Sequence, residues 1–483
     1  MTFVSDFEPK ILWQYFDKIL TIPRGSKSEG KIREYIISVA EKNGRDYVQD
    51  AVGNLVIRKP GTAGHENAAG VILQAHIDMV NEKNSDVDFD FDKDAIVPQI
   101  DGDYLKATGT TLGADNGIGV AAMLAIMSDN SLEHGPLELL FTIDEETGLT
   151  GAQGLGNDLL KGRQLLNLDT EEENSLCIGC AGGGDTRVTV AIKRIAKPAG
   201  TVGLQFKLTG LKGGHSGCDI HMQKGNAVKL MVRALYACSE KMKFNIVDIA
   251  GGDKHNAIPR EAFATAVIDA GSKDQFVAKM KAQMAAIAEE YKSVEPGFTF
   301  QVADAEVSTK VLDDASSQML LNFAQAMPHG VIAMNYFIPG LVDTSTNFAK
   351  IRLNDDAIFV LMSSRSAITS GMNAIRERIH AVAGLVNGSL EESDAYPGWQ
   401  PNMDSRLLKI MKELYTKETG VKPEVGAIHA GLECGIIGAK YDGMDMISFG
   451  PQIEFPHSPD ERVKIDTVGT FYKMLLKSLK ELV

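Results

Sequence analysis

The sequence predicts an α/β protein built on a mostly parallel sheet, with an α+β region inserted into the chain. Short apolar strands alternate with helical segments towards both ends, a pattern typical of parallel sheets covered by helices. From about Lys197 to about Tyr396, strand-like runs of alternating polarity lie beside long helical patterns, which indicates antiparallel α+β structure. The composition, 44% hydrophobic and 23% charged over 483 residues, is that of a folded globular protein. We therefore expect a discontinuous domain over residues 1–196 and 397–483 and an inserted domain over 197–396.

In the discontinuous domain, each of the first three predicted strands is followed in the sequence by acidic or imidazole side chains. They are Val71–Ala75 before His76, Leu137–Ile143 before Glu145 and Glu146, and Leu165–Leu168 before Asp169. The spacing of apolar residues over Gly117–Met127 predicts a helix between the first two strands. Near the C-terminus, Met444–Phe449 predicts a strand and Thr467–Leu482 an amphipathic closing helix.

The inserted domain contains both kinds of element. The expected strands are Val202–Leu208, Ala262–Ile268 and Ala357–Met362, and the expected helices are Ala227–Met242 and Gln275–Tyr291. The turn-rich stretch Ala395–Pro401 is the expected return into the first domain.

Charge and cysteine usage exclude several classes of protein. Forty-nine basic against 64 acidic residues give a net charge of −15, which argues against nucleic acid or an anionic membrane as partner. Five cysteines, an odd number in a long chain, fit a reducing compartment, and neither a secretory signal nor a membrane-spanning run is visible. We expect a cytoplasmic protein. The pair Cys177 and Cys180 has metal-like spacing, but no second pair accompanies it, so we interpret it as structural.

Five side chains form a candidate metal site. In open α/β sheets, sites form at the carboxyl ends of the strands, and a loop after the last predicted strand adds a second histidine. Imidazole and carboxylate groups suit Zn²⁺ or another borderline divalent ion. The negative charges of three carboxylates and one bridging hydroxide balance the positive charge of two such ions. We expect the two ions to lie about 3.5–4 Å apart, as is typical of two-metal hydrolases. The predicted ligands are His76, Asp115, Glu146, Asp169 and His457.

Two further carboxylates complete the predicted chemistry. Asp78, two residues after His76, is expected to accept the second N–H of that imidazole and so orient it. Glu145, next to a ligand but not needed for charge balance, is the expected general base and acid. The acidic run Glu171–Glu173, by contrast, is expected to be a solvated surface.

At these residues the sequence resembles the dinuclear-zinc metallopeptidases, the family of aminoacylase, carboxypeptidase G, the tripeptidases and carnosinase. Over the whole chain it is similar to the branch of non-specific and aminoacyl-histidine dipeptidases. The matching segments are Leu73–Val80, Gly109–Gly119, Leu211–Gly217, His255–Glu261, Tyr396–Pro401, His429–Gly435 and Pro456–Glu461.

The resemblance implies a role for each candidate residue. His76 and Asp169 would hold one metal, Glu146 and His457 the other, and Asp115 would bridge them. The two ions would be zinc, or alternatively cobalt or manganese. The inserted domain would be a lid that also forms a homodimer.

The resemblance also implies substrate-binding residues in the lid. His215 would stabilise the oxyanion, from its own chain or from a partner's, and Asn256 and Arg365 would bind the substrate carboxylate. An ordinary surface arginine is the alternative for Arg365. His429 and Glu433, at helical spacing, either line the pocket or pack beneath it; we group His429 with the substrate-binding residues.

The implied activity is metal-dependent hydrolysis of unblocked dipeptides, with broad specificity that includes Xaa-His dipeptides such as carnosine. A metal-bridging hydroxide would attack the peptide carbonyl, with Glu145 moving the proton. An N-acyl-amino-acid deacylase with the same metal centre is the first alternative, because both reactions cleave an amide next to a carboxylate. A catalytically inactive binding protein is the second, although all the ligands and the base are present in the sequence.

Overall fold

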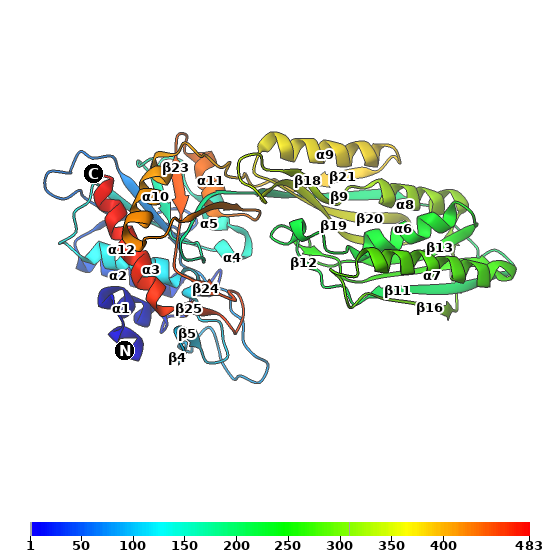
Figure 1. Ribbon diagram of the computed structural model, residues 1–483, viewed down its shortest axis with the longest axis horizontal. Coiled ribbons are helices and arrows are strands. Elements are labelled where there is room, and N and C mark those ends of the chain that lie inside the picture. The colour runs from blue at the N-terminus through cyan, green and yellow to red at the C-terminus, as the bar shows by residue number, and fades with distance from the viewer. Residues whose placement is uncertain (1, 309) are drawn as a thin grey trace. The chain divides into compact units, whose positions relative to one another are not determined.

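The computed structural model describes residues 2–308 and 310–483, and the chain in it divides into two compact units (Figure 1). The first unit comprises Met1–Gly179, Trp399–Ala427 and Leu432–Val483, and the second comprises Cys180–Gly398 and Ile428–Gly431. The predicted combination of a mostly parallel α/β sheet with a separate α+β unit is confirmed. Among the described residues, no helix has the length and apolar character needed to cross a membrane.

The sheet of the first unit has eight strands, of which the four central ones are parallel. Their order is β1 (Asp46–Gln49), β2 (Leu55–Lys59), β6 (Leu137–Thr142), β3 (Val71–His76), β7 (Gln164–Asn167), β23 (Asp445–Ser448), β8 (Ser175–Cys180) and β22 (Glu424–Ile428). Every residue of β3, β6 and β7 is buried, as expected for strands covered on both faces. A smaller antiparallel sheet joins β24 (Ile453–Glu454), β25 (Arg462–Lys464), β5 (Tyr104–Ala107) and β4 (Pro98–Asp101).

The helices of the first unit include one that is buried on all sides. They are α1 (Lys10–Ile19), α2 (Gly30–Lys42), α3 (Ala114–Ser128), α4 (Glu145–Gly148), α5 (Thr150–Gly154), α10 (Arg406–Thr419), α11 (Glu433–Lys440) and α12 (Ile465–Glu481), with a 3₁₀ turn at Phe3–Asp6. In α3 every residue up to Met127 is buried, which explains why its sequence is apolar on all sides. The prediction of this helix is confirmed: α3 includes Ala114–Asn116, but Asp115 and Asn116 have non-helical φ and ψ angles, so the regular part of the helix begins at Gly117.

The second unit is built on an antiparallel sheet, with β18 (Gly330–Met334) paired to the side of β19. The other strands are, in order, β16 (Thr299–Ala305), β11 (Thr201–Thr209), β15 (Ala262–Asp269), β13 (Phe244–Gly251), β19 (Val342–Leu353), β20 (Ala357–Ser366), β9 (Gly182–Ala191) and β21 (Ser389–Glu392). Two short ribbons pair β10 (Arg194–Ile195) with β17 (Val311–Leu312) and β12 (Gly214–His215) with β14 (Ala257–Ile258).

The core of the second unit lies between its sheet and its helices. The helices are α6 (Ala227–Ser239), α7 (Lys273–Glu290), α8 (Asp314–Ala326) and α9 (Thr369–Gly384), and 3₁₀ turns occur at Ile220–Met222 and Ala270–Ser272. Their apolar side chains and those of the strands form one continuous cluster around Phe206, Phe276 and Phe348. Each unit therefore contains its own set of buried apolar side chains.

Candidate active site

Asp115 is the central residue of the candidate metal site. Its Oδ1 lies 2.9 Å from His76 Nε2, and its Oδ2 lies 3.2 Å from His457 Nε2. His76 ends β3, whereas Asp115 lies in the first turn of α3 and His457 follows β24. The two oxygens of one carboxylate therefore face two different histidines.

The two remaining predicted ligands extend this arrangement on opposite sides. Asp169 Oδ1 lies 3.3 Å from His76 Nε2, and Glu146 Oε2 lies 2.9 Å from His457 Nε2. The side chains thus form two groups, His76 with Asp169 and His457 with Glu146, and both share Asp115. Hydrogen bonds that His457 donates to the carboxylates of Asp115 and Glu146 raise the pKa of His457 to about 11. Burial, and then the charge of Asp115, raises the pKa of Asp169 and Glu146.

The donor atoms fit divalent metal ions. One ligand atom from each of His76, Asp115 and Asp169 lies within 4.8 Å of the others, and the same holds for Asp115, Glu146 and His457. Buried Glu146 Oε1 has no hydrogen-bond partner among the described residues. Two imidazole nitrogens with carboxylate oxygens are a ligand set suited to zinc and similar ions. These groups can therefore hold metal, and no such group among the described residues contains a cysteine.

Asp78 lies behind His76 and is completely buried. Its Oδ1 lies 3.3 Å from His76 Nδ1, which leaves Nε2 directed at Asp115 and Asp169. The same carboxylate accepts hydrogen bonds from the backbone N–H groups of Glu145 at 3.1 Å and Glu146 at 3.3 Å. A single side chain thus fixes both the imidazole and the start of α4, the helix that carries the two glutamates.

Glu145 is close to the ligands but pairs with none of the histidines. Its carboxylate can approach within 4.8 Å of ligand atoms on His76 and Glu146. Burial raises the pKa of Glu145 well above the ordinary value, and the neighbouring carboxylates Asp169 and Glu146 raise it further. The group is therefore suited to taking up and releasing a proton.

The sequence alone did not identify several residues of this unit that contact the predicted ligands or the loop that carries Asp115. Asn116 donates a hydrogen bond of 2.5 Å to Asp169, and the buried residues Arg24 and Glu461 bind the loop that carries Asp115. Glu461 lies within the segment that matches the family, but Arg24 follows no recognisable pattern. The prediction that Glu171 is solvated is wrong, because the residue is half-buried and burial raises the pKa of its carboxyl to about 9. Glu172 and Glu173 are exposed as expected.

The second unit brings together His215, Arg365 and His429. His215 Nδ1 accepts hydrogen bonds from the backbone N–H groups of Gly217 at 3.3 Å and Cys218 at 3.0 Å. Burial lowers the pKa of His215 to about 4, which keeps the ring neutral near pH 7. Its Nε2 lies 3.4 Å from Arg365 Nη2.

Arg365 is not an ordinary surface residue, because it is only 7% exposed. It donates to the Tyr396 hydroxyl at 3.1 Å, while its buried Nε has no partner among the described residues. No carboxylate of the described part of the chain pairs with it within 4.0 Å. A buried guanidinium without an anion is suited to binding a carboxylate from outside the chain.

His429 and Glu433, although four residues apart, do not lie on one helix. Helix α11 begins at Glu433, and His429 precedes it in the short segment that belongs to the second unit. His429 Nε2 lies 2.7 Å from the Ser345 hydroxyl, whereas Glu433 accepts from Gln74 at 2.6 Å and Thr142 at 2.7 Å within the first unit. The two residues therefore serve different clusters.

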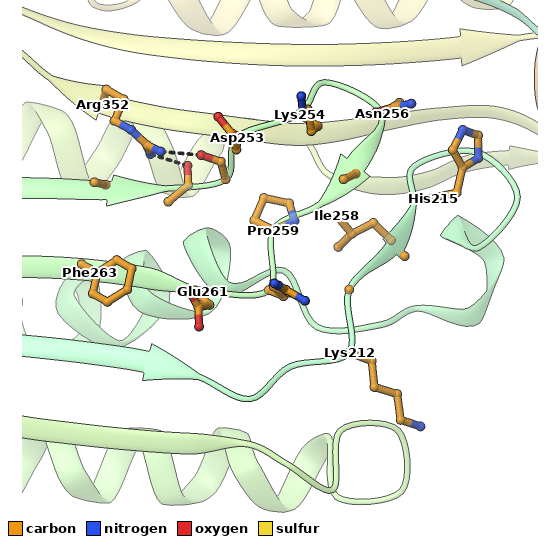
Figure 2. Close-up of a pocket in the computed structure, with 17 residues that line it drawn as sticks. Lys212, His215, Asp253, Lys254, Asn256, Ile258, Pro259, Glu261, Phe263 and Arg352 are labelled. Atoms are coloured by element: carbon orange, nitrogen blue, oxygen red, sulfur yellow. Dashed lines mark hydrogen bonds between the residues drawn. The ribbon is translucent and has the colours of Figure 1, made fainter. Parts of the chain in front are cut away.

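A pocket of about 630 Å³ lies entirely within the second unit. Figure 2 shows His215 and Asn256 at one end of this pocket and Arg352 and Phe263 at the other. Asn256 is exposed, and its backbone carbonyl accepts from Ser216 at 2.8 Å. The predicted substrate-binding residues His215 and Asn256 thus border one cavity.

Comparison with known proteins agrees with this geometry. Residues 72–481 match the model of peptidase family M20/M25/M40. The cytosol non-specific dipeptidase of Escherichia coli is 41% identical over 482 residues, covering 100% of this chain and 99% of that protein. The structure of aminoacylhistidine dipeptidase from Vibrio alginolyticus is 44% identical, with a TM-score of 0.92 and coverage of 99% and 98%.

A tripeptidase structure from Staphylococcus aureus, 16% identical with a TM-score of 0.58, covers 99% of both chains and shares the fold. The family match covers most of the chain, and the two similar dipeptidases align along its full length. The chain therefore belongs to peptidase family M20/M25/M40 and is a metallopeptidase, a hydrolase.

Proposed function

We propose that the protein hydrolyses unblocked dipeptides of broad sequence, including Xaa-His dipeptides such as carnosine. The observation that carries this proposal is the Asp115 carboxylate, whose oxygens face His76 at 2.9 Å and His457 at 3.2 Å. The names of the two similar proteins, a non-specific dipeptidase and an aminoacylhistidine dipeptidase, support the same substrate class.

The ligand groups would hold two divalent ions, zinc in the first place, with cobalt or manganese as alternatives. His76 and Asp169 would hold one ion, Glu146 and His457 the other, and Asp115 would bridge them. When bound, such a pair of ions polarises a carbonyl and supplies a nucleophile at neutral pH. This chain contributes the fixed donor geometry, since Asp78 orients His76 and also binds the start of α4.

Glu145 would move the proton in the reaction. A dipeptide amide leaves as an amine only when its nitrogen gains a proton. Glu145, a buried carboxyl that pairs with no described histidine, accepts a proton at Oε from the attacking water as the water oxygen bonds to the carbonyl carbon. It then passes that proton to the nitrogen as the C–N bond breaks. Burial favours the protonated form of Glu145, which makes the uptake step favourable.

The second unit would serve as the lid and dimerisation domain expected for residues 197–396. His215 donates from Nε2 to the developing oxyanion, while Arg365, with Asn256, binds the substrate's carboxylate. His429 would support this group through Ser345. A binding site that requires a free carboxylate close to the cleaved amide favours very short peptides.

A panel of free and N-acetylated dipeptides tests the proposal, with metal-stripped protein and protein reconstituted with Zn²⁺, Co²⁺ or Mn²⁺. We expect hydrolysis of the free dipeptides, lost on stripping and restored by metal. Preference for acetylated amino acids would instead identify a deacylase. Reconstituted protein that cleaves none of these substrates would contradict both activities.

We further propose a cytoplasmic homodimer. The name of the Escherichia coli relative supports a cytosolic location. Light scattering of the purified protein would give about twice the chain mass of 52.2 kDa for the dimer. A mass of one chain with full activity would remove the need for a partner at the active site.

A further inference from the structure

The carboxylate of Glu461 binds four consecutive backbone amides. Its Oε2 accepts from Leu112 and Gly113, both at 2.8 Å, and its Oε1 accepts from Ala114 at 2.7 Å and Asp115 at 3.3 Å. Glu461 is only 2% exposed, so little water competes for these bonds. Charge-assisted hydrogen bonds of this kind are about twice as strong as neutral ones.

The amides converge because of the local backbone at the start of α3. Gly113 has a φ of +71°, in the left-handed region that favours glycine. A Cβ atom at this position would lie 2.4 Å from the guanidinium of Arg24. The four amides precede the regular part of α3, because Asp115 and Asn116 have non-helical φ and ψ angles. Successive backbone N–H groups that turn towards one point form a concave site that attracts an anion. Here the chain supplies that anion itself, from a residue 346 positions beyond Asp115.

Arg24 binds the same loop through its carbonyl groups. Its guanidinium donates to Gly113 O and to two carbonyls just after β3, Ile77 at 3.2 Å and Asp78 at 2.6 Å. The amide side of the Asp115 loop is thus fixed by Glu461, and its carbonyl side is tied to the segment that carries His76. Arg24 is 3% exposed, so this contact is also buried.

We infer that Glu461 is a positioning residue, which sets the distance between Asp115 and His457 and so shapes the metal site. Glu461 follows His457 by four residues in the same loop, and its backbone N–H closes that loop on Ser458 at 3.0 Å. One carboxylate therefore joins the segment of one predicted ligand to the backbone of another. Without this carboxylate, the loop would no longer hold His457 Nε2 at 3.2 Å from Asp115 Oδ2.

The inference rests on the proposed metal centre, and Glu461→Gln tests it with Co²⁺ alone as the probe. The amide is almost the same size, but its NH₂ group meets N–H donors and cannot accept from them. We expect the affinity of metal-stripped protein for Co²⁺ to fall about 10–100-fold, with a changed visible Co²⁺ spectrum. Glu454→Gln is the matched control, because Glu454 ends β24 just before this loop but bonds to Tyr104 and Arg462 instead.

Unchanged Co²⁺ affinity and spectrum in Glu461→Gln would overturn the inference. If that variant does not fold, hydrogen exchange in the wild type decides. Slow exchange of the Leu112–Asp115 amides in the metal-free protein supports their binding by Glu461, and rapid exchange contradicts it. If the wild-type protein binds no Co²⁺ while these amides remain protected, the proposed metal centre is contradicted. The binding of the four amides by Glu461 is then still supported.

Discussion

Glu145 and Glu146 are neighbours in the sequence, yet their surroundings give the two carboxyl groups different chemistry. Glu146 lies 2.9 Å from His457 and belongs to a candidate metal group. Glu145 pairs with no described histidine, lysine or arginine, and burial raises its pKa. This difference supports the proposal that Glu146 is a metal ligand and Glu145 a proton carrier, and Asp78 accepts hydrogen bonds from the backbone N–H groups of both.

Glu145→Gln is expected to lower turnover by about 10²–10⁴-fold, the usual contribution of general acid–base catalysis. Metal content should remain that of the wild type, because the side chain is not a proposed ligand. Elemental analysis and kcat measured on the same preparation check both statements. Glu146→Gln is the comparison variant and should lose metal as well as activity. Normal turnover in Glu145→Gln would remove this residue from the mechanism.

His215→Ala is expected to lower kcat by about 10²–10³-fold, as for the loss of one oxyanion donor. Since burial lowers the pKa of His215 to about 4, the ring stays neutral above about pH 5. The pH profile of kcat between pH 5 and 8 should therefore keep its shape in the variant. His215→Asn, which retains an N–H donor, should lose less. Disappearance of a limb near pH 6–7 in His215→Ala would show that His215 titrates there.

At the scale of elements, the strands and helices could be predicted from the sequence, but the contacts between distant segments could not. The fully apolar runs of β3 and β6 and the small apolar residues of α3 determine those elements locally. The Ala114 N–H at the start of α3 donates to Glu461, and no local pattern reveals a partner 347 residues away. Arg24 was missed for the same reason, since a buried arginine that binds carbonyls resembles any other arginine in the sequence.

Four of the predicted metal ligands could be recognised because they lie at or just after the end of a strand, or at the start of a helix, which is a local property; His457 instead lies in a loop after β24. The residues of the second unit could not be assigned from local patterns in the same way. Whether Arg365 is buried depends on neighbouring strands and on Tyr396, and these contacts form only in the folded chain. The spacing of His429 and Glu433 suggested a common helix. The two residues lie apart because the chain passes from the second unit to the first just before α11.

The junction of α6 with β19 offers a test of pH-dependent stability. His329 Nδ1 accepts from Phe348 N at 3.3 Å and faces Asn226 Nδ2 at 3.4 Å, so the ring is neutral. Burial, with help from Lys229, lowers the pKa of His329 to about 3. Between about pH 6.5 and 3, the unfolded chain binds a proton there that the folded chain does not. The free energy of unfolding therefore falls as pH decreases, by up to about 1.4 kcal/mol per pH unit from this group.

His329→Asn is the variant that isolates this effect. Asparagine keeps an acceptor but does not titrate, so the variant should gain stability relative to the wild type as pH falls from 7 to 5. Urea unfolding at several pH values measures the difference, and subtraction removes the contribution of the other histidines. A difference that does not change with pH would mean that His329 has an ordinary pKa in the folded protein.

At the scale of the whole molecule, the two units differ in how their stability depends on metal. All five proposed ligands belong to the first unit, and they concentrate three carboxylates around Asp115. The second unit has its own apolar core and contains none of those ligands. Because a ligand stabilises only the structure that binds it, metal should stabilise the two units unequally.

Removal of metal with a chelator is therefore expected to loosen the first unit selectively. At a free metal concentration 100 times Kd, binding contributes about 2.7 kcal/mol per site, and stripping also restores repulsion between the carboxylates. Hydrogen exchange followed by mass spectrometry should show faster exchange in peptides that contain Asp115, Glu146 and His457. Peptides from α6 in the second unit, around Val228–Leu235, serve as the internal control and should exchange at the same rate with and without metal. Equal acceleration in both units would mean that metal binding stabilises the chain as a whole and not the unit that holds the ligands.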